Sequence, residues 1–413
     1  MISRLSAPML VQLELTEGCN HRCFHCYNSF ARSSKSMGAN QISRVMDQLT
    51  ENKVFSVVLT GGEPLVNRKG VYFALERGRS LPMDFFLNTN LSLNLGAEDL
   101  SMLGLTKFVL VSFLSYSEER FNDIVGANSY RKVLNNLEKL TSEGIHFGVN
   151  QVVSSKNRQD VYKTGQFLFE RFGLRSFSAS PMVPVREEDA IYQLSPEEVV
   201  SLGRDLIRLE KDYGIRADML ECVPPCVFPS DMREHVIAHH GCSAGKDFVS
   251  VSTSGLVKRC PKLNESYGNI FEEDLKEIWS RMDGHRKPLN SLCNGCSAAE
   301  GCYAGCEARA ALGKGVDLLV KGATSPYRDV HCAQMLPGRI YRMQQIRWRP
   351  EGEELLIAGV EDGFVFGNDM LRQFITRLQG GNFTLAEGVE RFGDDAPILL
   401  NYLYQRRIVR DAV

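Results

Sequence analysis

Short runs of β-branched and aromatic residues alternate with amphipathic stretches between residues 11 and 181. Six of these runs have the composition of strands and cover residues 11–16, 56–60, 84–88, 107–112, 146–152 and 176–180. Between them, apolar residues recur at helical spacing, as at Ile42, Val45, Met46 and Leu49, so that one helix face is apolar. Six such βα units predict an α/β fold, a partial (β/α)6 barrel of the TIM type, with reactive groups at the carboxyl ends of its strands.

The pattern changes twice along the rest of the chain. A capped helix is expected over residues 196–213, after which Gly, Pro and Cys replace regular periodicity. Three short strands and three helices, one opening with a Thr384 and Glu387 capping box, predict a small winged-helix-like α+β module at the end. We therefore expect a barrel domain at 1–214, a Cys-rich domain at 215–338 and the small module at 339–413.

Composition narrows the class of protein. The 413 residues are 43% hydrophobic and 24% charged, without the roughly 18 unbroken apolar residues of a membrane span or an apolar secretory signal. We expect a cytoplasmic protein that binds no membrane, and the net charge of -2 gives no reason to expect nucleic acid. Its 12 cysteines form two groups, at 19–26 and 222–332, and clustered thiols in a reducing compartment indicate metal rather than disulfides.

The first cysteine group follows the first strand as Cys19-x3-Cys23-x2-Cys26. Three close thiolates can bind three irons of a cubane and leave the fourth iron for a substrate. Zinc held with a distant histidine, or with His21 or His25, is the alternative for this spacing alone. The second strand ends in Gly61-Gly62-Glu63-Pro64, where glycines allow close approach and a carboxylate can accept hydrogen bonds from an ammonium group.

Together these two motifs resemble the radical S-adenosylmethionine (radical SAM) superfamily over residues 8 to about 185. The resemblance implies a 4Fe-4S cluster bound by Cys19, Cys23 and Cys26, whose free iron chelates SAM, while Gly61, Gly62 and Glu63 hold the methionine ammonium. Reductive cleavage of SAM then gives a 5'-deoxyadenosyl radical that takes a hydrogen atom from an unactivated carbon.

Four more residues lie where this family touches the nucleotide. His25 takes the place of an aromatic residue before the third cysteine and is expected to pack on adenine, or else to be a solvent-facing loop side chain. The resemblance places Asn88, Ser112 and Asn150 near the ribose or carboxylate, although each could simply satisfy a strand-end backbone group. No catalytic acid or base can be identified.

The second cysteine group resembles the seven-cysteine SPASM extension of radical SAM enzymes, which carries two auxiliary iron–sulfur clusters. The resemblance assigns Cys242, Cys260 and Cys306 to the first auxiliary cluster, and Cys293, Cys296, Cys302 and Cys332 to the second. A fourth cysteine that some members place shortly after the first is replaced here by Phe248. The first cluster is therefore open at one iron or capped by Cys222 or Cys226, which otherwise are buried or surface thiols. Zinc-ribbon pairing is the alternative for the whole region.

Residues from about 346 to 413 resemble the RiPP recognition element, a winged-helix domain that binds the leader of a ribosomal precursor peptide. An exposed strand edge would accept the leader as an added strand. The alternative is a helical cap on the SPASM region, and 8 basic against 11 acidic residues weigh against DNA.

These features predict an enzyme, a radical SAM/SPASM oxidoreductase that installs a thioether, ether or C–C cross-link in a precursor peptide. Its expected partners are the leader-bearing peptide and an electron donor such as flavodoxin or ferredoxin. Alternatives are a SPASM enzyme that oxidises a small metabolite or a protein side chain, peptide epimerisation, and a non-enzymatic zinc scaffold.

Overall fold

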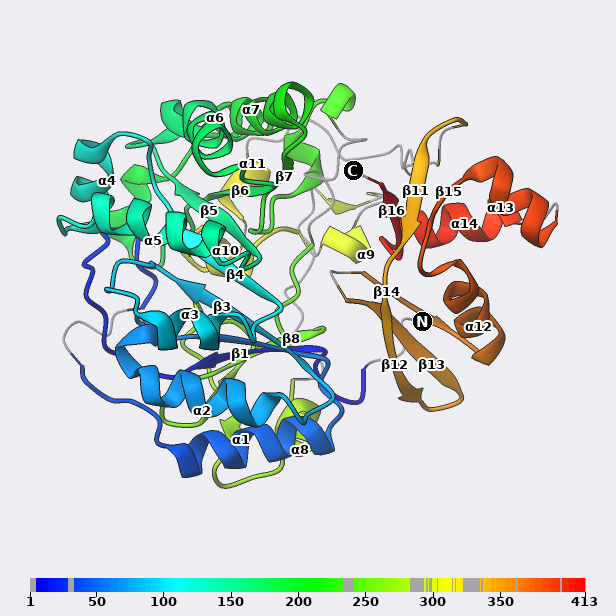
Figure 1. The fold of residues 1–413 in the computed structure, drawn as a ribbon, viewed down its shortest axis with the longest axis horizontal. Helices are drawn as coiled ribbons and strands as arrows, with labels where there is room; N and C mark the ends of the chain where they lie inside the picture. Colours follow the sequence, from blue (N-terminus) through cyan, green and yellow to red (C-terminus); the bar gives the residue numbers. More distant parts are fainter. Residues whose placement is uncertain are drawn as a thin grey trace. The chain divides into compact units, whose positions relative to one another are not determined.

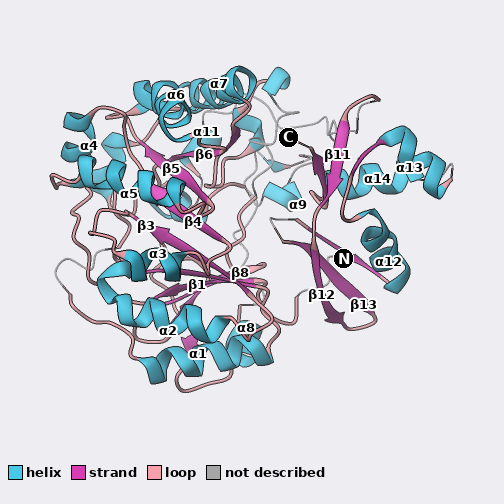
Figure 2. Cartoon of the chain, in the orientation of Figure 1, coloured by secondary structure: helices cyan, strands magenta, loops and turns pink. Residues whose placement is uncertain are grey.

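The computed structural model describes residues 5–28, 33–232, 241–282, 293–294, 296, 299–302, 304–313, 315, 317–321, 335, 337–360, 363–393 and 396–412. The chain forms two compact units, Met1–Asp329 and Val330–Val413. Figure 1 draws both units along the chain, and Figure 2 marks their helices and strands.

The first unit is built on one sheet with the strand order β10-β9-β8-β1-β2-β3-β4-β5-β6-β7. Its strands are β1 (Leu10–Glu14), β2 (Ser56–Thr60), β3 (Asp84–Thr89), β4 (Phe108–Ser112), β5 (Phe147–Val153), β6 (Ser176–Pro181), β7 (Arg216–Asp218), β8 (Phe248–Val251), β9 (Leu256–Lys258) and β10 (Gly268–Asn269). Strands β1 to β7 are all parallel, so their carboxyl ends share one edge of the sheet. The six predicted strands and the α/β barrel class are confirmed.

Helices α1 to α7 pack on the outer face of this curved sheet (Figure 1). The helices of the unit are α1 (Ala39–Glu51), α2 (Arg68–Gly78), α3 (Ala97–Leu103), α4 (Glu118–Val125), α5 (Tyr130–Ser142), α6 (Val161–Phe172), α7 (Pro196–Tyr213), α8 (Leu275–Ser280), α9 (Ala299–Cys302), α10 (Glu307–Leu312) and α11 (Leu318–Lys321). Ile42, Val45, Met46 and Leu49 form the fully buried face of α1, as their spacing predicts. Helix α7 begins at the predicted residue, because Ser195 caps it.

The Cys-rich segment is more regular than its composition suggests. Strand β8 pairs in parallel with β1, and β9 and β10 continue the sheet in antiparallel fashion. The side chains of Val249, Val251 and Val257 are fully buried. The segment therefore shares the barrel's sheet and compact unit, which explains why it shows little amphipathic pattern of its own.

The second unit contains two three-stranded sheets, β12-β13-β14 and β15-β11-β16. Its elements are β11 (Ile340–Met343), β12 (Ile346–Glu351), β13 (Glu354–Gly359), β14 (Phe364–Gly367), α12 (Asp369–Leu378), β15 (Asn382–Thr384), α13 (Leu385–Phe392), α14 (Ala396–Gln405) and β16 (Val409–Asp411). The three strands and three helices read from the sequence are present, and Thr384 and Glu387 form the predicted capping box. The second sheet was not predicted, because its strands are short and come from distant parts of the module.

Candidate active site

The first three cysteines lie on the loop that follows β1, at the carboxyl edge of the sheet. The backbone of this loop is fixed to the end of α4, since the Arg22 N–H donates to the Val125 carbonyl over 2.9 Å. Gly126 ends α4 with φ +62°, and a Cβ there would lie 3.0 Å from the Arg22 carbonyl oxygen. The loop is therefore placed by packing against a helix as well as by the strand that precedes it.

The two histidines of this loop have different surroundings. His21 is buried and its Nε2 lies 2.9 Å from Ser129 Oγ, while burial lowers the pKa of His21 to about 4. The half-buried His25 ring meets Phe24 edge to face at 5.4 Å, and burial, opposed by Asp189, lowers its pKa to about 4. His21 thus anchors the loop, and packing of His25 on adenine stays a prediction.

The three thiols of the loop influence one another electrostatically. Burial raises the pKa of Cys19 to about 11, and Cys26 adds to the rise. Burial raises the pKa of Cys23 further still, and Cys26 and Cys19 both add to that rise. The His21 N–H and the Asn90 amide approach Cys19 Sγ at 3.4 and 3.9 Å. Such donors stabilise a thiolate. Three neighbouring thiols, each able to take a different iron, fit the three protein ligands of a cubane.

Within the described residues, no three His, Cys, Asp or Glu side chains gather around a point where one metal ion could bind. Cubane coordination differs from that of a single ion, because each iron takes one cysteine and the sulfurs stay apart.

The two glycines after β2 pack against the backbone that leads into Cys19. Gly61 has φ +147°, and an added Cβ would lie 2.3 Å from the Thr16 carbonyl oxygen. At Gly62 the added Cβ would lie 2.3 Å from the Gly18 carbonyl oxygen, which also accepts the Glu63 N–H over 2.8 Å. The glycines therefore hold the ends of β1 and β2 together, a role that sequence reasoning missed.

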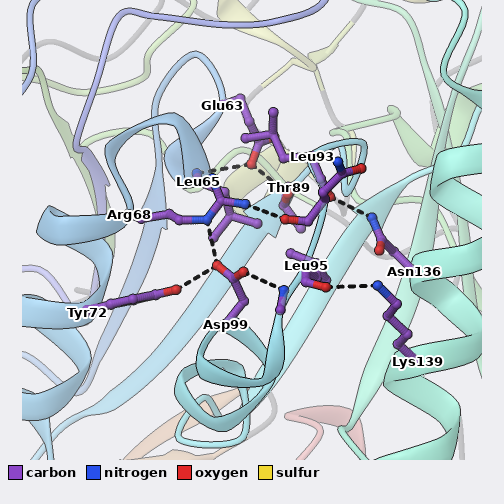
Figure 3. Close-up of polar contacts among 12 residues, drawn as sticks. Glu63, Leu65, Arg68, Tyr72, Thr89, Leu93, Leu95, Asp99, Asn136 and Lys139 are labelled. Carbon is purple, nitrogen blue, oxygen red and sulfur yellow. Dashed lines mark hydrogen bonds and ion pairs between the residues drawn. The ribbon is translucent and has the colours of Figure 1, made fainter.

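Glu63 is fully buried and accepts three hydrogen bonds, of which Figure 3 shows those from Leu65 and Thr89. Its Oε1 accepts from the Thr89 hydroxyl over 2.7 Å and the Leu65 N–H over 3.1 Å, and its Oε2 accepts from the Asn90 N–H over 2.7 Å. Burial raises the pKa of Glu63 to about 7 despite these donors. The carboxylate joins the ends of β2 and β3, and contact with a methionine ammonium stays a prediction.

The remaining predicted nucleotide contacts lie on neighbouring strands. Ser112 of β4 is in register with Asn150 of β5, and Asn88 lies on β3 beside Leu110 of β4. All three are half-buried, and Asn150 Oδ1 accepts from the Ser180 hydroxyl over 2.9 Å. The sheet therefore places them on adjacent strands, and no contact in the described residues tests their role toward the nucleotide.

A polar group on β1 was not identified from the sequence. Glu14 is buried, and burial raises its pKa to about 7, against Lys258 and a hydrogen bond from Asn28. Gln12 donates to the Tyr27 hydroxyl over 3.0 Å, next to Cys26. A carboxylate inside a run of strand residues was the only signal for this group.

The second cysteine group divides into two neighbourhoods. Cys222 and Cys306 are buried together, and Cys242 packs against them. Cys302 lies near Cys226, Cys293 and Cys296. Burial is the main cause that raises the pKa of Cys302 to about 12, and each of these three cysteines adds to the rise. The assignment of these cysteines to two separate clusters stays a prediction, and Cys332 lies outside the described residues.

Residues 13–168 match the model of the Radical SAM superfamily. This segment of the chain is a Radical SAM domain. Its N-terminal cysteines and the turn after β2 thus sit within the matched domain, and radical SAM enzymes use a 4Fe-4S cluster together with SAM. The predicted enzyme class and these cofactors are confirmed, and the zinc scaffold is wrong.

Curated relatives match most of the chain. An AdoMet-dependent heme synthase of Methanosarcina barkeri is 27% identical over 335 residues, covering 75% of this chain and 94% of the relative. Mycofactocin maturase MftC of Mycolicibacterium smegmatis is 24% identical over 316 residues, covering 74% of this chain and 79% of the relative.

Solved structures with the same fold include Streptococcus suis SuiB bound to its precursor peptide SuiA, with a TM-score of 0.63 and 17% identity, covering 79% of this chain and 76% of SuiB. Another is anSMEcpe with bound AdoMet, with a TM-score of 0.59 and 18% identity, covering 78% of this chain and 93% of that protein. In the part of the chain that the structure describes, no helix has the length and apolarity to cross a membrane.

Proposed function

We propose that this radical SAM enzyme is a SPASM-type peptide maturase that installs an oxidative thioether, ether or C–C cross-link in a ribosomally made precursor peptide. The observation that carries the proposal is the separate unit at Val330–Val413, which adds a small α+β module to the barrel and Cys-rich region. The SuiB structure, solved with a precursor peptide, supports the proposal through its fold.

A 4Fe-4S cluster bound with SAM at this site would supply the radical chemistry that removes a hydrogen atom from an unactivated carbon. In this proposal Cys19, Cys23 and Cys26 hold the cluster, and the Gly61 to Glu63 turn binds the methionine ammonium through its backbone. His25, Asn88, Ser112 and Asn150 orient the nucleotide from the loop and neighbouring strands.

The Cys-rich region holds the two auxiliary clusters in this proposal. Cys242, Cys260 and Cys306 bind the first, and Cys293, Cys296, Cys302 and Cys332 bind the second. A peptide radical that forms a new bond must lose one further electron, and a nearby cluster can accept it. A flavodoxin or ferredoxin supplies the electron that starts each turnover.

The C-terminal module binds the leader. Among the described residues, β14 is an outer strand of the β12-β13-β14 sheet, so its free edge can add a peptide strand through main-chain hydrogen bonds. Exposed apolar side chains of the same module, including those of Trp348 on β12 at 47% and Met370 on α12 at 75%, offer contacts for leader side chains.

The test is truncation after Pro337. The truncated enzyme should cleave SAM without peptide as the full chain does, but should leave the precursor unmodified, whereas the full chain removes about 2 Da, two hydrogen atoms, per cross-link. A synthetic leader added to the full-length enzyme should inhibit processing by competition, which checks the result without truncation. Full processing by the truncated enzyme would reject leader recognition, and an unchanged mass with altered residue chirality would show epimerisation instead.

A tetrapyrrole substrate is the second candidate, favoured by the likeness to the heme synthase over 335 residues. Spectrophotometric titration of the full-length protein with an iron porphyrin separates the two. Saturable porphyrin binding, combined with no change in the mass of a co-expressed peptide, would favour the second candidate.

A further inference from the structure

Cys222 lies outside the seven-cysteine pattern, yet its thiol is inside the first auxiliary site. Its side chain is 8% exposed and belongs to one apolar cluster with Cys306, against which Cys242 packs. Cys226, four residues later, is less buried and lies near Cys302, whereas the cysteines that act most strongly on Cys222 are Cys242 and Cys306, with Cys302 after them. Of the two cysteines that the sequence leaves open as the fourth ligand, Cys222 therefore lies closer to the other cysteines of the first auxiliary site.

Ion pairs between residues that flank the cysteines bring three chain segments together. Glu221, directly before Cys222, pairs with Lys262, two residues after Cys260. Arg259, directly before Cys260, donates to both carboxylate oxygens of Glu307 over 2.8 and 2.6 Å. Since Glu307 directly follows Cys306, the two pairs link the segments of Cys222, Cys260 and Cys306.

A buried ion pair also connects two of these segments, those of Cys222 and Cys306. Arg309 and Asp317 are both fully buried, and Arg309 Nε donates to Asp317 Oδ1 over 3.0 Å. The same Arg309 donates to the Cys222 carbonyl oxygen, while Asp317 Oδ2 accepts the Cys306 N–H over 2.6 Å. One ion pair thus holds the backbones of Cys222 and Cys306 in place.

One hydrogen-bond donor of the Arg309 guanidinium is unused. Its Nη1 is buried and has no hydrogen-bond partner among the described residues. A buried guanidinium donor beside cysteines suits a bound anionic cluster, whose sulfurs accept hydrogen bonds.

We propose that Cys222 is the fourth protein ligand of the first auxiliary cluster, with Cys242, Cys260 and Cys306. The inference rests on the proposed auxiliary clusters and deepens them. Four thiolates leave this cluster without a free iron, so it accepts an electron from the substrate radical and does not bind a substrate atom.

The experiment isolates the auxiliary clusters in full-length protein with Cys19, Cys23 and Cys26 changed to Ala. After anaerobic reconstitution this parent should hold about eight irons. Its EPR spectrum, recorded after reduction, should not change when cyanide is added as a probe for an open iron. Introducing Cys222→Ala should make one cluster's signal respond to cyanide, or remove about four irons.

Two matched variants serve as controls. Val223→Ala truncates the neighbouring fully buried side chain and should keep both the iron and the cyanide-insensitive spectrum. Cys226→Ala tests the competing ligand. A cyanide response in the parent itself, or in Cys226→Ala but not in Cys222→Ala, would overturn the assignment. An unchanged spectrum and iron content in Cys222→Ala would also overturn the assignment of Cys222. A parent that takes up no iron would instead refute the auxiliary clusters themselves.

Discussion

Replacing Gly62 with Ala tests whether the turn after β2 holds the cysteine loop in place. The added Cβ would lie 2.3 Å from the Gly18 carbonyl oxygen and 2.7 Å from that of Glu17. Both obstacles are backbone atoms, so one of the two loops must move by roughly 1 Å to reach ordinary contact, at a cost of about 1–3 kcal/mol. The movement falls directly before Cys19.

We expect Gly62→Ala to lose about four of about twelve irons per chain. SAM cleavage without peptide should fall by roughly tenfold or more, the factor that corresponds to about 1.4 kcal/mol. Iron analysis after anaerobic reconstitution and chromatographic assay of 5'-deoxyadenosine measure the two effects. Gly38→Ala is the control, because its Cβ would meet only Gln41 Oε1, at 4.0 Å.

A different result would show that Gly62 serves SAM binding and does not position the cysteine loop. If Gly62→Ala keeps its full iron content and only weakens SAM binding, the glycine makes room for the nucleotide, and our packing argument is wrong.

Two ion pairs give further predictions. Burial alone would raise the pKa of Asp99, but donors from Tyr72, Gly96 and Arg68 outweigh it and hold that pKa below 3.8 (Figure 3). The native state therefore favours the charged form, so Asp99→Asn should lower the free energy of unfolding by roughly 1–2 kcal/mol at pH 7. In urea titrations that difference should shrink as the pH falls below 4, and a constant difference would contradict the assignment. Asp317→Asn leaves Arg309 buried without its counter-charge and should cost about 3–5 kcal/mol. Combining Arg309→Met with Asp317→Leu should leave most of that loss in place, because the double variant also loses the bonds to the Cys222 carbonyl and the Cys306 N–H, and full recovery would contradict this backbone role.

Local signals were enough to predict most of the barrel. The strands and the first helix carry their own periodicity, and Ser195 carries its own capping signal, so each could be placed from adjacent residues. The three-cysteine loop and the turn after β2 follow two of these strands, which brings them to one edge of the sheet. That shared edge made the first site predictable.

Contacts between distant segments could not be predicted. Strand β8 pairs with β1 although their sequences lie far apart, and the Cys-rich segment therefore appeared to lack a core. The Glu63 side chain faces Thr89 only because β2 and β3 are neighbours. The sequence likewise left Cys222 and Cys226 as equal choices, since the pair between Glu221 and Lys262 exists only in the folded chain.

The pairing of β1 with β8 also bears on how the protein is made. During translation the chain leaves the ribosome from its amino end, so β1 lacks its outer neighbour until residues 248–251 have been synthesised. Thr253, which donates to Glu17 beside the cysteine loop over 2.8 Å, arrives equally late. An open strand edge and three unprotected thiols thus persist on the nascent chain until that point, which predicts that iron loading follows the synthesis of residue 253 and that chaperones bind the amino-terminal half before then.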